Sequence, residues 1–453
     1  MIFNAPGKIC LTTDNWKSQH TKLEYICITA HFIDDKWKLQ KRILRFRALV
    51  PPYDIVHTDE IDLFLSQWNL KHKIFSITDN ASYNDTMISI LNGRLATKEF
   101  LVCNGEFFQI RCCAHILNLI VQSGLDSIVD IINKIGEIMK YIDKSQVRRK
   151  KFFDVAKKSF HLDVRRRFRF DCPMRWNSTY TMLDNALYYK NVFDYFGSRS
   201  HVLRSYEISK IEWKYISMVH KFLKVFYEVT IMFSAHNTPT SNLFFRGVWK
   251  IHSKLLEVAN EPSHLLCNTA KTMQPKFDKY WANYNGILSC VALLDPRCKI
   301  NFLKYCYGKI YGKDKMDEMV EKVVTTLHKL FDEYRQETSS SVGTSNEEPS
   351  SGGNFLSDMG DEQFEDYKEF LGETTTTHGK SQLDLYFEEP THNLTEDLDV
   401  LEFWNKSSMR YPELSKMARD VLSIPVTSVA SESAFSIGNK IITASRRLDS
   451  CGR

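Results

Sequence analysis

The sequence predicts an α/β core that is interrupted by a large all-α domain. Two observations carry this prediction. Strand-like segments alternate with helix over the first 111 residues, and helical periodicity then continues from about residue 126 to 334 with few strand signals. Because a helical block of that length does not belong inside a small sheet domain, we expect it to be an insertion into the α/β core.

The first three strands are expected at residues 8–13, 24–32 and 37–46. The second and third segments are rich in β-branched and aromatic residues and partly alternate in polarity. Between them, Asp34-Asp35-Lys36 has the composition of a hairpin turn. We therefore expect the three segments to pair as sequential antiparallel strands.

A helix and two further strands follow. Residues 58–70 carry apolar side chains at helical spacing, residues 74–80 return to a strand pattern, and residues 107–111 form a fifth strand. The order strand, strand, strand, helix, strand is that of an RNase H-like sheet, in which the first and fourth strands lie side by side. The sequence therefore predicts this class of sheet.

Three acidic residues stand out against this background. Asp14 in LTTDNW and Asp79 in SITDNAS end the first and fourth strands in the same Thr-Asp-Asn triplet. Asp also favours strand ends because its side chain bonds to nearby backbone, but two carboxylates on neighbouring strands repel unless a cation intervenes. Glu432 lies among small and apolar residues near the C-terminus. Its alternative role is to complement a helix dipole.

Six motifs occur in a characteristic order: LTTDNW, SITDNAS, RCCAHILNL, MRWNSTYTML, ALLDPRCKINFL and YPELSKMARDVLSIPVTSVASESAFS. Together they resemble the hAT superfamily of DNA transposases over nearly the whole chain, in particular the plant branch whose members carry an N-terminal BED zinc finger. The last motif is similar to the C-terminal hAT dimerisation region. The resemblance implies an RNase H-like catalytic core with an α-helical insertion domain before its final helix.

The resemblance also implies a catalytic triad of Asp14, Asp79 and Glu432. Three carboxylates from separate segments can hold two Mg²⁺ or Mn²⁺ ions, which activate a water or a 3′-hydroxyl and stabilise the leaving oxygen in DNA strand cleavage and transfer. Hard oxygen ligands suit these ions. The expected cofactor is therefore Mg²⁺ or Mn²⁺.

Further positions match the family pattern near its active site. Trp16 and Trp176 offer rings on which an unpaired base can stack, and Arg175 can hold a phosphate. Without the family, Trp176 is interpreted as a core aromatic. Cys112 and His115 match a C-x-x-H motif and are assigned to the architecture of the active site or, alternatively, to a buried helix. No zinc site is evident from these two ligands.

The distribution of charge along the chain predicts that DNA is its partner. The chain carries +5 overall, but residues 336–399 carry −14, which leaves +19 for the rest. A basic run, Arg148, Arg149, Lys150 and Lys151, is interleaved with phenylalanines. It suits phosphate contact or nuclear import, and a solvated helix face over an aromatic core is the alternative. We expect a nuclear protein.

Other partners are not expected. The eleven cysteines lack regular spacing and the N-terminus lacks a secretory pattern, which indicates reduced thiols. No apolar run reaches the length of a membrane helix, so a membrane is not expected as a partner. A small-molecule substrate is not expected either, since the resemblance implies DNA as the substrate. A homodimer or larger homo-oligomer is expected instead, as the similarity to the dimerisation region implies. An apolar stripe near the C-terminus is expected to pack against the inserted helices or against a second subunit, because it would otherwise leave a large apolar patch in water. The stripe consists of Phe403, Trp404, Leu414, Met417, Val421 and Leu422.

Four regions result: residues 1–125 as the first part of the core, 126–335 as the insertion domain, 336–382 as an acidic disordered linker, and 383–453 as the dimerisation region with the final core helix. The chain lacks a C-x-x-C…H-x-x-x-H pattern and stops soon after Glu432. Two functions therefore stay open: a DNA-cutting transposase core, and a domesticated or decayed derivative that binds DNA or chromatin and dimerises without cutting. A nuclease of the same fold is a third.

Overall fold

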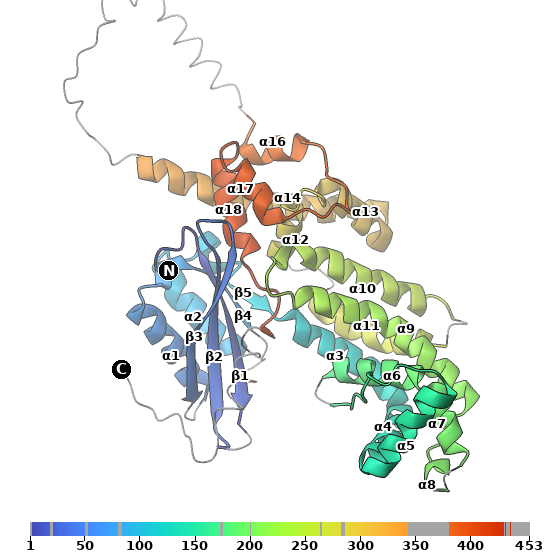
Figure 1. Ribbon diagram of the computed structural model, residues 1–453. Coiled ribbons are helices and arrows are strands. Elements are labelled where there is room, and N and C mark those ends of the chain that lie inside the picture. The colour runs from blue at the N-terminus through green and yellow to red at the C-terminus, as the bar shows by residue number, and fades with distance from the viewer. Residues whose placement is uncertain are drawn as a thin grey trace, which may run out of the picture.

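A computed structural model gives the fold of the chain. It describes every residue except 1, 19–20, 50–52, 80–83, 173–174, 200, 263–264, 282–285, 343–379, 430, 432–434 and 436–453. Figure 1 shows a sheet with two covering helices, a lobe of helices that extends away from it, and a smaller group of helices above the sheet.

The sheet has five strands in the order β3-β2-β1-β4-β5. Strands β1 and β2 are antiparallel, as are β2 and β3, whereas β1 and β4 are parallel. The prediction that the first and fourth strands are neighbours is therefore confirmed. The strand bounds are β1 Ile9–Lys17, β2 Glu24–Ile33, β3 Leu39–Leu49, β4 Ile74–Asp79 and β5 Gln109–Arg111.

The predicted hairpin turn joins β2 and β3. The Asp34 carboxylate accepts hydrogen bonds from the backbone N–H groups of Lys36 at 3.0 Å and Lys38 at 2.9 Å, so this side chain organises the turn. Trp37 adopts a positive φ of 55° inside the turn. For this reason β3 begins at Leu39, whereas the sequence pattern predicted that it begins at Trp37.

The two faces of the sheet have different chemistry. One face is apolar and packs against α1 (Tyr53–Gln67) and α2 (Asn84–Ala96) in a core that includes Leu11, Ile28 and Phe64. Helix α1 begins earlier than the predicted helix at residues 58–70 and ends before Asn69, whose φ is +47°. The other face carries Thr12, His31 and other polar side chains. It is covered by the C-terminal segment, which begins at Ser423.

The helical lobe packs mainly through four helices, α3 (Cys113–Leu125), α9 (Lys210–Phe233), α10 (Phe244–Ala259) and α11 (Cys267–Trp281). A Ser209–Glu212 capping box starts α9. Because α3 packs on α9 and α11, the helical body already begins near residue 113. The end of the lobe farthest from the sheet contains α4 (Val129–Asp143), α5 (Gln146–Ser159), α6 (Trp176–Tyr188), α7 (Lys190–Gly197) and α8 (His201–Arg204) (Figure 1).

The helices above the sheet close the fold. Helix α14 (Lys313–Val342) packs against α12 (Gly286–Leu293), α13 (Ile300–Tyr311) and α18 (Pro412–Leu422). It runs past the predicted linker boundary at residue 335. After the linker, Ser381 caps α16 (Gln382–Glu388), and α17 (Val400–Ser407) leads to α18. Short 3₁₀ helices are η1 Lys71–Lys73, η2 Val102–Gly105, η3 Asp126–Ile128 and η4 Ser241–Leu243.

One helical stretch, Cys113–Asp143, is long and apolar enough to cross a membrane by length and composition. It was not expected from the sequence, and it arises because α3, η3 and α4 follow one another without a break. Its apolar side chains, such as Leu117, Ile120 and Met139, lie in the main hydrophobic core with those of α9 and α11. Helices at the centre of a globular core have this same composition.

Candidate functional site

Asp14 lies inside β1, which continues to Lys17, and Asp79 ends β4, so both lie at the edge of the sheet where β4 ends. In the parallel ladder between β1 and β4, Thr12 is opposite Thr78, so Asp79 follows that pair by one residue and Asp14 by two. With strands roughly 4.8 Å apart and a rise of roughly 3.3 Å per residue, their α-carbons are about 6 Å apart. Asp14 shares the face of Thr12, and Asp79 is the last residue of β4.

The surroundings of these two carboxylates suit a cation. Asp79 is only 5% exposed, and its backbone carbonyl accepts a hydrogen bond from the Cys112 N–H at 2.9 Å. Carboxylate oxygens are hard ligands of the kind that Mg²⁺ and Mn²⁺ prefer. Burial raises the pKa of Cys27, opposite Asp14, to about 11, and the negative charge of Asp14 adds to that rise. The donor set therefore fits such an ion.

Glu432, the third predicted ligand, lies outside the described residues. Its described neighbours Ser431 and Phe435 both contact β1. The Ser431 hydroxyl is 3.0 Å from that of Thr12, and the Phe435 ring stacks on Trp16 with centroids 5.8 Å apart. Thr12 and Trp16 flank Asp14 on the same face of β1. Among the described residues, no group of three or more His, Cys, Asp or Glu side chains could hold a metal ion.

Trp16 belongs to an aromatic cluster at this edge. It is half-buried, stacks on Phe435 and contacts Tyr25 at a centroid distance of 5.7 Å. Phe46 on β3 completes the cluster through Tyr25 and Phe435. One face of the indole is therefore used within the chain.

Cys112 links β4 to the C-terminal segment, and His115 contacts Cys112. Cys112 is the N-cap residue of α3, and its sulfur lies 3.2 Å from His115 Nδ1. The same sulfur accepts hydrogen bonds from the Ser428 N–H at 3.3 Å and the Ser428 hydroxyl at 3.4 Å. Burial raises the pKa of the Cys112 thiol, so the group is a neutral contact here.

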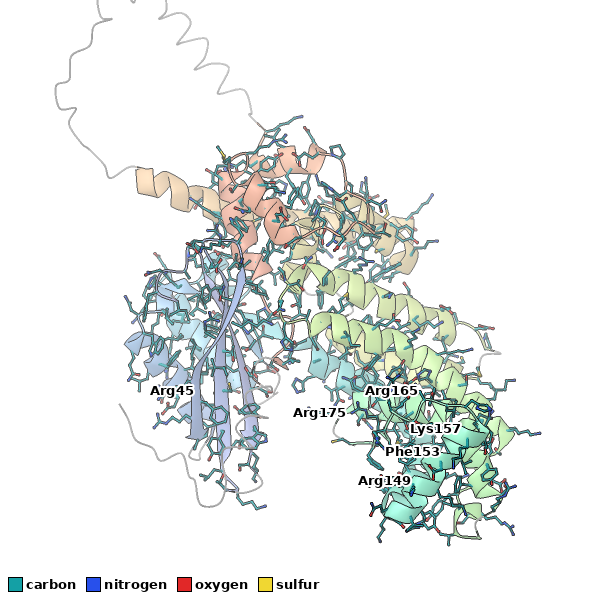
Figure 2. All side chains as sticks on the ribbon, in the orientation of Figure 1. Arg45, Arg149, Phe153, Lys157, Arg165 and Arg175 are labelled. Carbon is teal, nitrogen blue, oxygen red and sulfur yellow. The ribbon has the colours of Figure 1, made fainter. Side chains whose placement is uncertain are left out.

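Arg175 and Trp176 lie at the start of α6 and differ in exposure. Arg175 is exposed, and Figure 2 labels it on the edge of the lobe that is nearer the sheet. Trp176 is 2% exposed and packs edge-on against Tyr180 and Tyr227. Its backbone N–H donates to Asn118 Oδ1 at 3.1 Å. Trp176 is thus part of the lobe's core, and its predicted contact with DNA stays a prediction.

The basic run lies on α5, at the far end of the lobe where Figure 2 labels Arg149 and Lys157. The Arg148 guanidinium lies 3.8 Å from the centroid of the Tyr141 ring, and Arg149 pairs with Asp143 at 3.4 Å. Lys150 and Lys151 are exposed and form no ion pair with a described residue. Phe152 and Phe153 on the opposite side of α5 are buried. The helix therefore combines an aromatic inner face with a basic outer face.

The predicted dimerisation stripe is covered by the chain itself. Five of its side chains are fully buried and the sixth, Phe403, is half-buried. The Trp404 indole donates to the Leu294 carbonyl at 2.9 Å. The expectation that the stripe packs against the helical domain or a second subunit is thus met by the first alternative. The fully buried members are Trp404, Leu414, Met417, Val421 and Leu422.

Sequence reasoning missed a buried carboxylate, Asp420 on α18. It accepts hydrogen bonds from the Lys8 N–H and the Tyr334 hydroxyl, both at 2.8 Å, and a Cβ at Gly7 would lie 2.1 Å from its Oδ1. Burial raises the pKa of Asp420 to about 6. This one side chain joins the entry of β1 to α14 and α18. The only signal in the sequence is an acid within an apolar helix stripe.

A second buried polar cluster explains part of the motif ALLDPRCKINFL. Arg297 binds Asp295 through two hydrogen bonds of 2.9 and 2.7 Å, and Asn242 donates to the same carboxylate at 2.9 Å. Lys299 is buried and donates to the Glu389 carbonyl at 2.9 Å. Burial lowers the pKa of Lys299 to about 8. The motif therefore fastens the helices after the linker to the helical domain.

Four family models match successive parts of the chain. They are the ZBED1 RNase-like domain over residues 12–107, the ZBED1 RNase-like helical domain over 110–222, the hAT-like transposase RNase-H fold over 242–334, and the hAT family C-terminal dimerisation region over 382–450. The part matched by the model named for the RNase-H fold is helical. Most of the five-stranded sheet lies within the first match, with the start of β1 before it and β5 at its border with the second match.

Similar proteins agree with these matches. The chain is 32% identical to Zinc finger BED domain-containing protein RICESLEEPER 2 of Oryza sativa subsp. japonica, over 98% of the chain and 62% of that protein. It is 32% identical to the Putative AC transposase of Zea mays, over 97% of the chain and 54% of that protein. The protein DAYSLEEPER of Arabidopsis thaliana is 29% identical over 95% of the chain and 60% of its own length.

An RNase H-like core, a helical domain and a dimerisation region in this order define a transposase-type protein. The chain belongs to the hAT transposase family. It spans about three fifths of the length of the curated relatives named above.

Proposed function

We propose that the chain is a hAT-type transposase core that cleaves and joins DNA strands at a divalent metal site formed by Asp14, Asp79 and Glu432. The observation that carries the proposal is the parallel pairing of β1 with β4, which brings Asp14 and Asp79 to one edge of the sheet. The contacts of Ser431 and Phe435 on either side of Asp14 support Glu432 as the third member.

In this proposal each residue has a defined task. Mg²⁺ or Mn²⁺, when bound, supplies an activated water or 3′-hydroxyl and stabilises the leaving oxygen. Asp14, Asp79 and Glu432 hold the ions and set their spacing. Cys112 and His115 hold the end of β4 against the C-terminal segment. Arg175 binds a phosphate, and Trp16 contributes a ring beside an unpaired base, whereas Trp176 supports Arg175 from the core of the lobe.

The proposal also names a partner, an assembly and a location: the protein binds DNA, forms a homo-oligomer and acts in the nucleus. The basic outer face of α5 suits phosphate contact, and the match of residues 382–450 to a dimerisation region supports self-association. Because the six stripe residues are mostly buried within one chain, a second copy would contact other side chains of α17 and α18. A basic, DNA-associated protein of this family acts in the nucleus.

A second candidate is a derivative that binds DNA or chromatin and dimerises without cutting. The specific observation in its favour is the separation of the two sites, since the basic run on α5 lies at the end of the lobe farthest from the sheet (Figures 1 and 2). Binding through α5 therefore does not depend on the carboxylates.

A strand-nicking assay distinguishes the two candidates. Duplex, pre-nicked and hairpin DNA are incubated with Mg²⁺ or Mn²⁺, and we expect nicking that is abolished by EDTA and by Asp79→Asn. Asp163→Asn on the exposed surface of the lobe is the matched control and keeps wild-type nicking. Absence of nicking by the wild-type chain on every substrate, with DNA binding retained, would leave only the second candidate.

A further inference from the structure

Two buried serines join the last described turn of the chain to the sheet. Ser428 and Ser431 are both fully buried, and the Ser431 N–H donates to the Ser428 carbonyl at 2.9 Å, which places them on one helical turn. A helix that packs on a sheet normally does so with apolar side chains. Two hydroxyls at this contact therefore call for a specific explanation, because a buried hydroxyl is unfavourable unless it is hydrogen-bonded.

Ser431 is tied to the strand that carries Asp14. Its hydroxyl lies 3.0 Å from the Thr12 hydroxyl and 3.3 Å from the Thr29 hydroxyl, and these two threonines are opposite each other on β1 and β2. Thr12 also lies 3.3 Å from His31 Nε2. Burial lowers the pKa of His31 to about 3, so its ring is a neutral hydrogen-bonding partner.

Ser428 is tied to the end of the strand that carries Asp79. Its N–H and hydroxyl both donate to the Cys112 sulfur, and the Cys112 N–H donates to the Asp79 carbonyl. The path from Ser428 to Asp79 thus consists of two hydrogen-bond steps through one buried residue. Thr78 reinforces it, because its hydroxyl donates to the Pro425 carbonyl at 2.8 Å.

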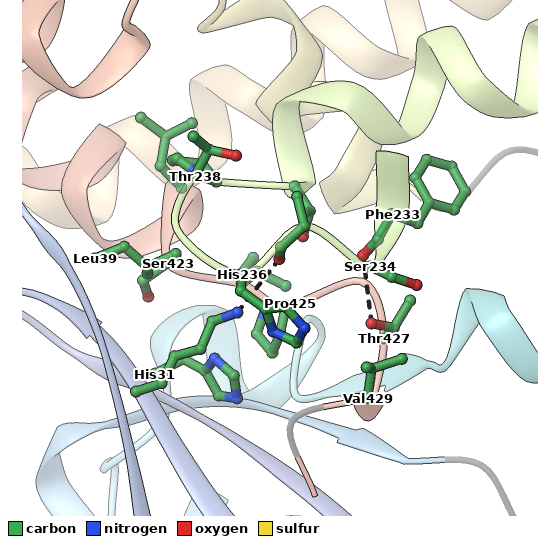
Figure 3. Close-up of a pocket in the computed structure, with 16 residues that line it drawn as sticks. His31, Leu39, Phe233, Ser234, His236, Thr238, Ser423, Pro425, Thr427 and Val429 are labelled. Carbon is green, nitrogen blue, oxygen red and sulfur yellow. Dashed lines mark hydrogen bonds between the residues drawn. The ribbon is translucent and has the colours of Figure 1, made fainter. Parts of the chain in front are cut away.

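The same segment is also held on its outer side. Figure 3 shows Thr427 bonded to the Phe233 carbonyl at the end of α9, next to a small pocket lined by His31, His236 and Pro425. The segment is therefore enclosed between the sheet and the helical lobe. Its depth above the sheet is set by directional bonds and not only by apolar packing.

We propose that Ser428 and Ser431 are positioning residues of the carboxylate site, and we call this pair the serine clamp. Ser431 fixes the helical turn that they share to β1, which carries Asp14, and Ser428 fixes the same turn to the end of β4, which carries Asp79. The clamp thereby sets how this turn lies against the parts of β1 and β4 that carry Asp14 and Asp79. The inference rests on the proposed carboxylate site, because a clamp without metal ligands has nothing to position.

Mn²⁺ binding to the full chain tests the clamp without relying on catalysis. The electron paramagnetic resonance signal of free Mn²⁺ gives the dissociation constant for each variant. We expect Ser431→Ala and Thr12→Val to weaken Mn²⁺ binding about tenfold, because groups that orient metal ligands typically contribute at least that much to affinity. Thr12→Ser keeps the hydroxyl and should bind Mn²⁺ as the wild type does.

Ser241→Ala is the matched control. Ser241 is also fully buried and donates to a backbone carbonyl, that of Leu422 at 3.3 Å, but it contacts neither aspartate strand. It should lower the melting temperature about as much as Ser431→Ala while leaving Mn²⁺ affinity unchanged. Equal Mn²⁺ affinity in Ser431→Ala and Ser241→Ala would show that the clamp is only structural and would overturn it.

Asp14→Asn and Asp79→Asn separate the clamp from the site on which it rests. If both variants lose Mn²⁺ binding and Ser431→Ala does not, the carboxylate site stands and the clamp is wrong. If Asp14→Asn and Asp79→Asn bind Mn²⁺ like the wild type, the carboxylate site is wrong, and the positioning role of the serines is overturned with it.

Discussion

The edge of the sheet and the far end of the helical lobe are held together by different forces. At the edge, the C-terminal segment is fixed by hydroxyl, thiol and backbone hydrogen bonds, for example those of Ser431 with Thr12 and of Ser428 with Cys112. In the lobe, the Phe152 ring packs against Phe168 and Tyr189 with centroids 5.1 and 5.4 Å apart, and charged side chains lie outside. Directional bonds suit a site that must place reacting groups, whereas an aromatic core can carry a binding surface that needs only the right charge.

The largest expected effect concerns the two tryptophans, one in each region. Trp176→Ala removes a fully packed indole from the lobe and should lower the free energy of unfolding by about 3–5 kcal/mol. Trp16→Ala removes a half-buried ring and should cost clearly less. Urea denaturation followed by circular dichroism measures both values.

A different result for Trp176 would change its interpretation. If Trp176→Ala left stability within about 1 kcal/mol of the wild type but impaired binding of hairpin or unpaired DNA, the indole would be a base-stacking residue. The contrast between an aromatic core in the lobe and a functional edge on the sheet would then no longer hold.

The next effect concerns pH and Asp420, which anchors the sheet to α14 and α18. The pKa of Asp420 is raised from about 3.9 in an unfolded chain to about 6 in the fold, so the folded state favours its protonated form. Its contribution to stability is therefore fully present below about pH 4 and is lost as the pH rises through 6, a change of about 3 kcal/mol.

Asp420→Asn removes this titration, so a comparison with the wild type isolates its contribution to the free energy of unfolding. The stability of the wild type relative to Asp420→Asn, from urea denaturation, should fall by about 3 kcal/mol between about pH 4 and pH 7.5. Asp163→Asn is the control at an exposed position of the lobe. A difference between wild type and Asp420→Asn that stays constant over this range would show that burial does not shift the pKa of the Asp420 carboxyl.

The smallest effect concerns the basic face of α5. The slope of log binding constant against log salt concentration should become shallower by about 0.9 for each phosphate that the protein no longer neutralises. Since Arg148 lies on Tyr141 and Arg149 pairs with Asp143, we expect the double variant Lys150→Ala/Lys151→Ala to change the slope by about 1.8. Filter binding to a random duplex at several salt concentrations measures it.

The double variant Arg148→Ala/Arg149→Ala is the matched control, because it removes the same amount of charge from the same helix. It should change the slope less, because those guanidinium groups have partners within the chain. If both variants showed the same salt dependence of DNA binding as the wild type, the four basic residues would not contact phosphate. Their role would then be nuclear import or solvation of the helix.

Local patterns in the sequence predicted much of the sheet and its edge. Alternation indicated the first strands, Asp34 indicated the hairpin turn, and the repeated Thr-Asp-Asn triplet pointed to neighbouring strands, which the pairing of β1 with β4 confirms. The prediction that Asp14 ends its strand was wrong, because β1 continues to Lys17 in its pairing with β2. These features depend on residues that are close in sequence or on a known strand order. The predicted convergence of Asp14, Asp79 and Glu432 stays a prediction.

Contacts between distant residues could not be predicted in the same way. Ser431 and Thr12 are 419 residues apart, and Asp420 and Lys8 are 412 apart. A serine or an aspartate within an apolar helix does not reveal its partner, because many surface or buried positions are compatible with it. The burial of Trp404 and Leu414 within a single chain was also not settled, since an apolar stripe does not show whether its cover is intramolecular.

The most direct test of the carboxylate site is a crystal structure of the full chain soaked with Mn²⁺, with the ions located by anomalous scattering. We expect one or two peaks, about 4 Å apart if two, at the sheet edge between Asp14 and Asp79, with the Glu432 carboxylate among the ligands. Asp79→Asn crystals should lack the peaks. Peaks elsewhere, or a Glu432 carboxylate more than about 10 Å from both aspartates, would contradict the proposed site.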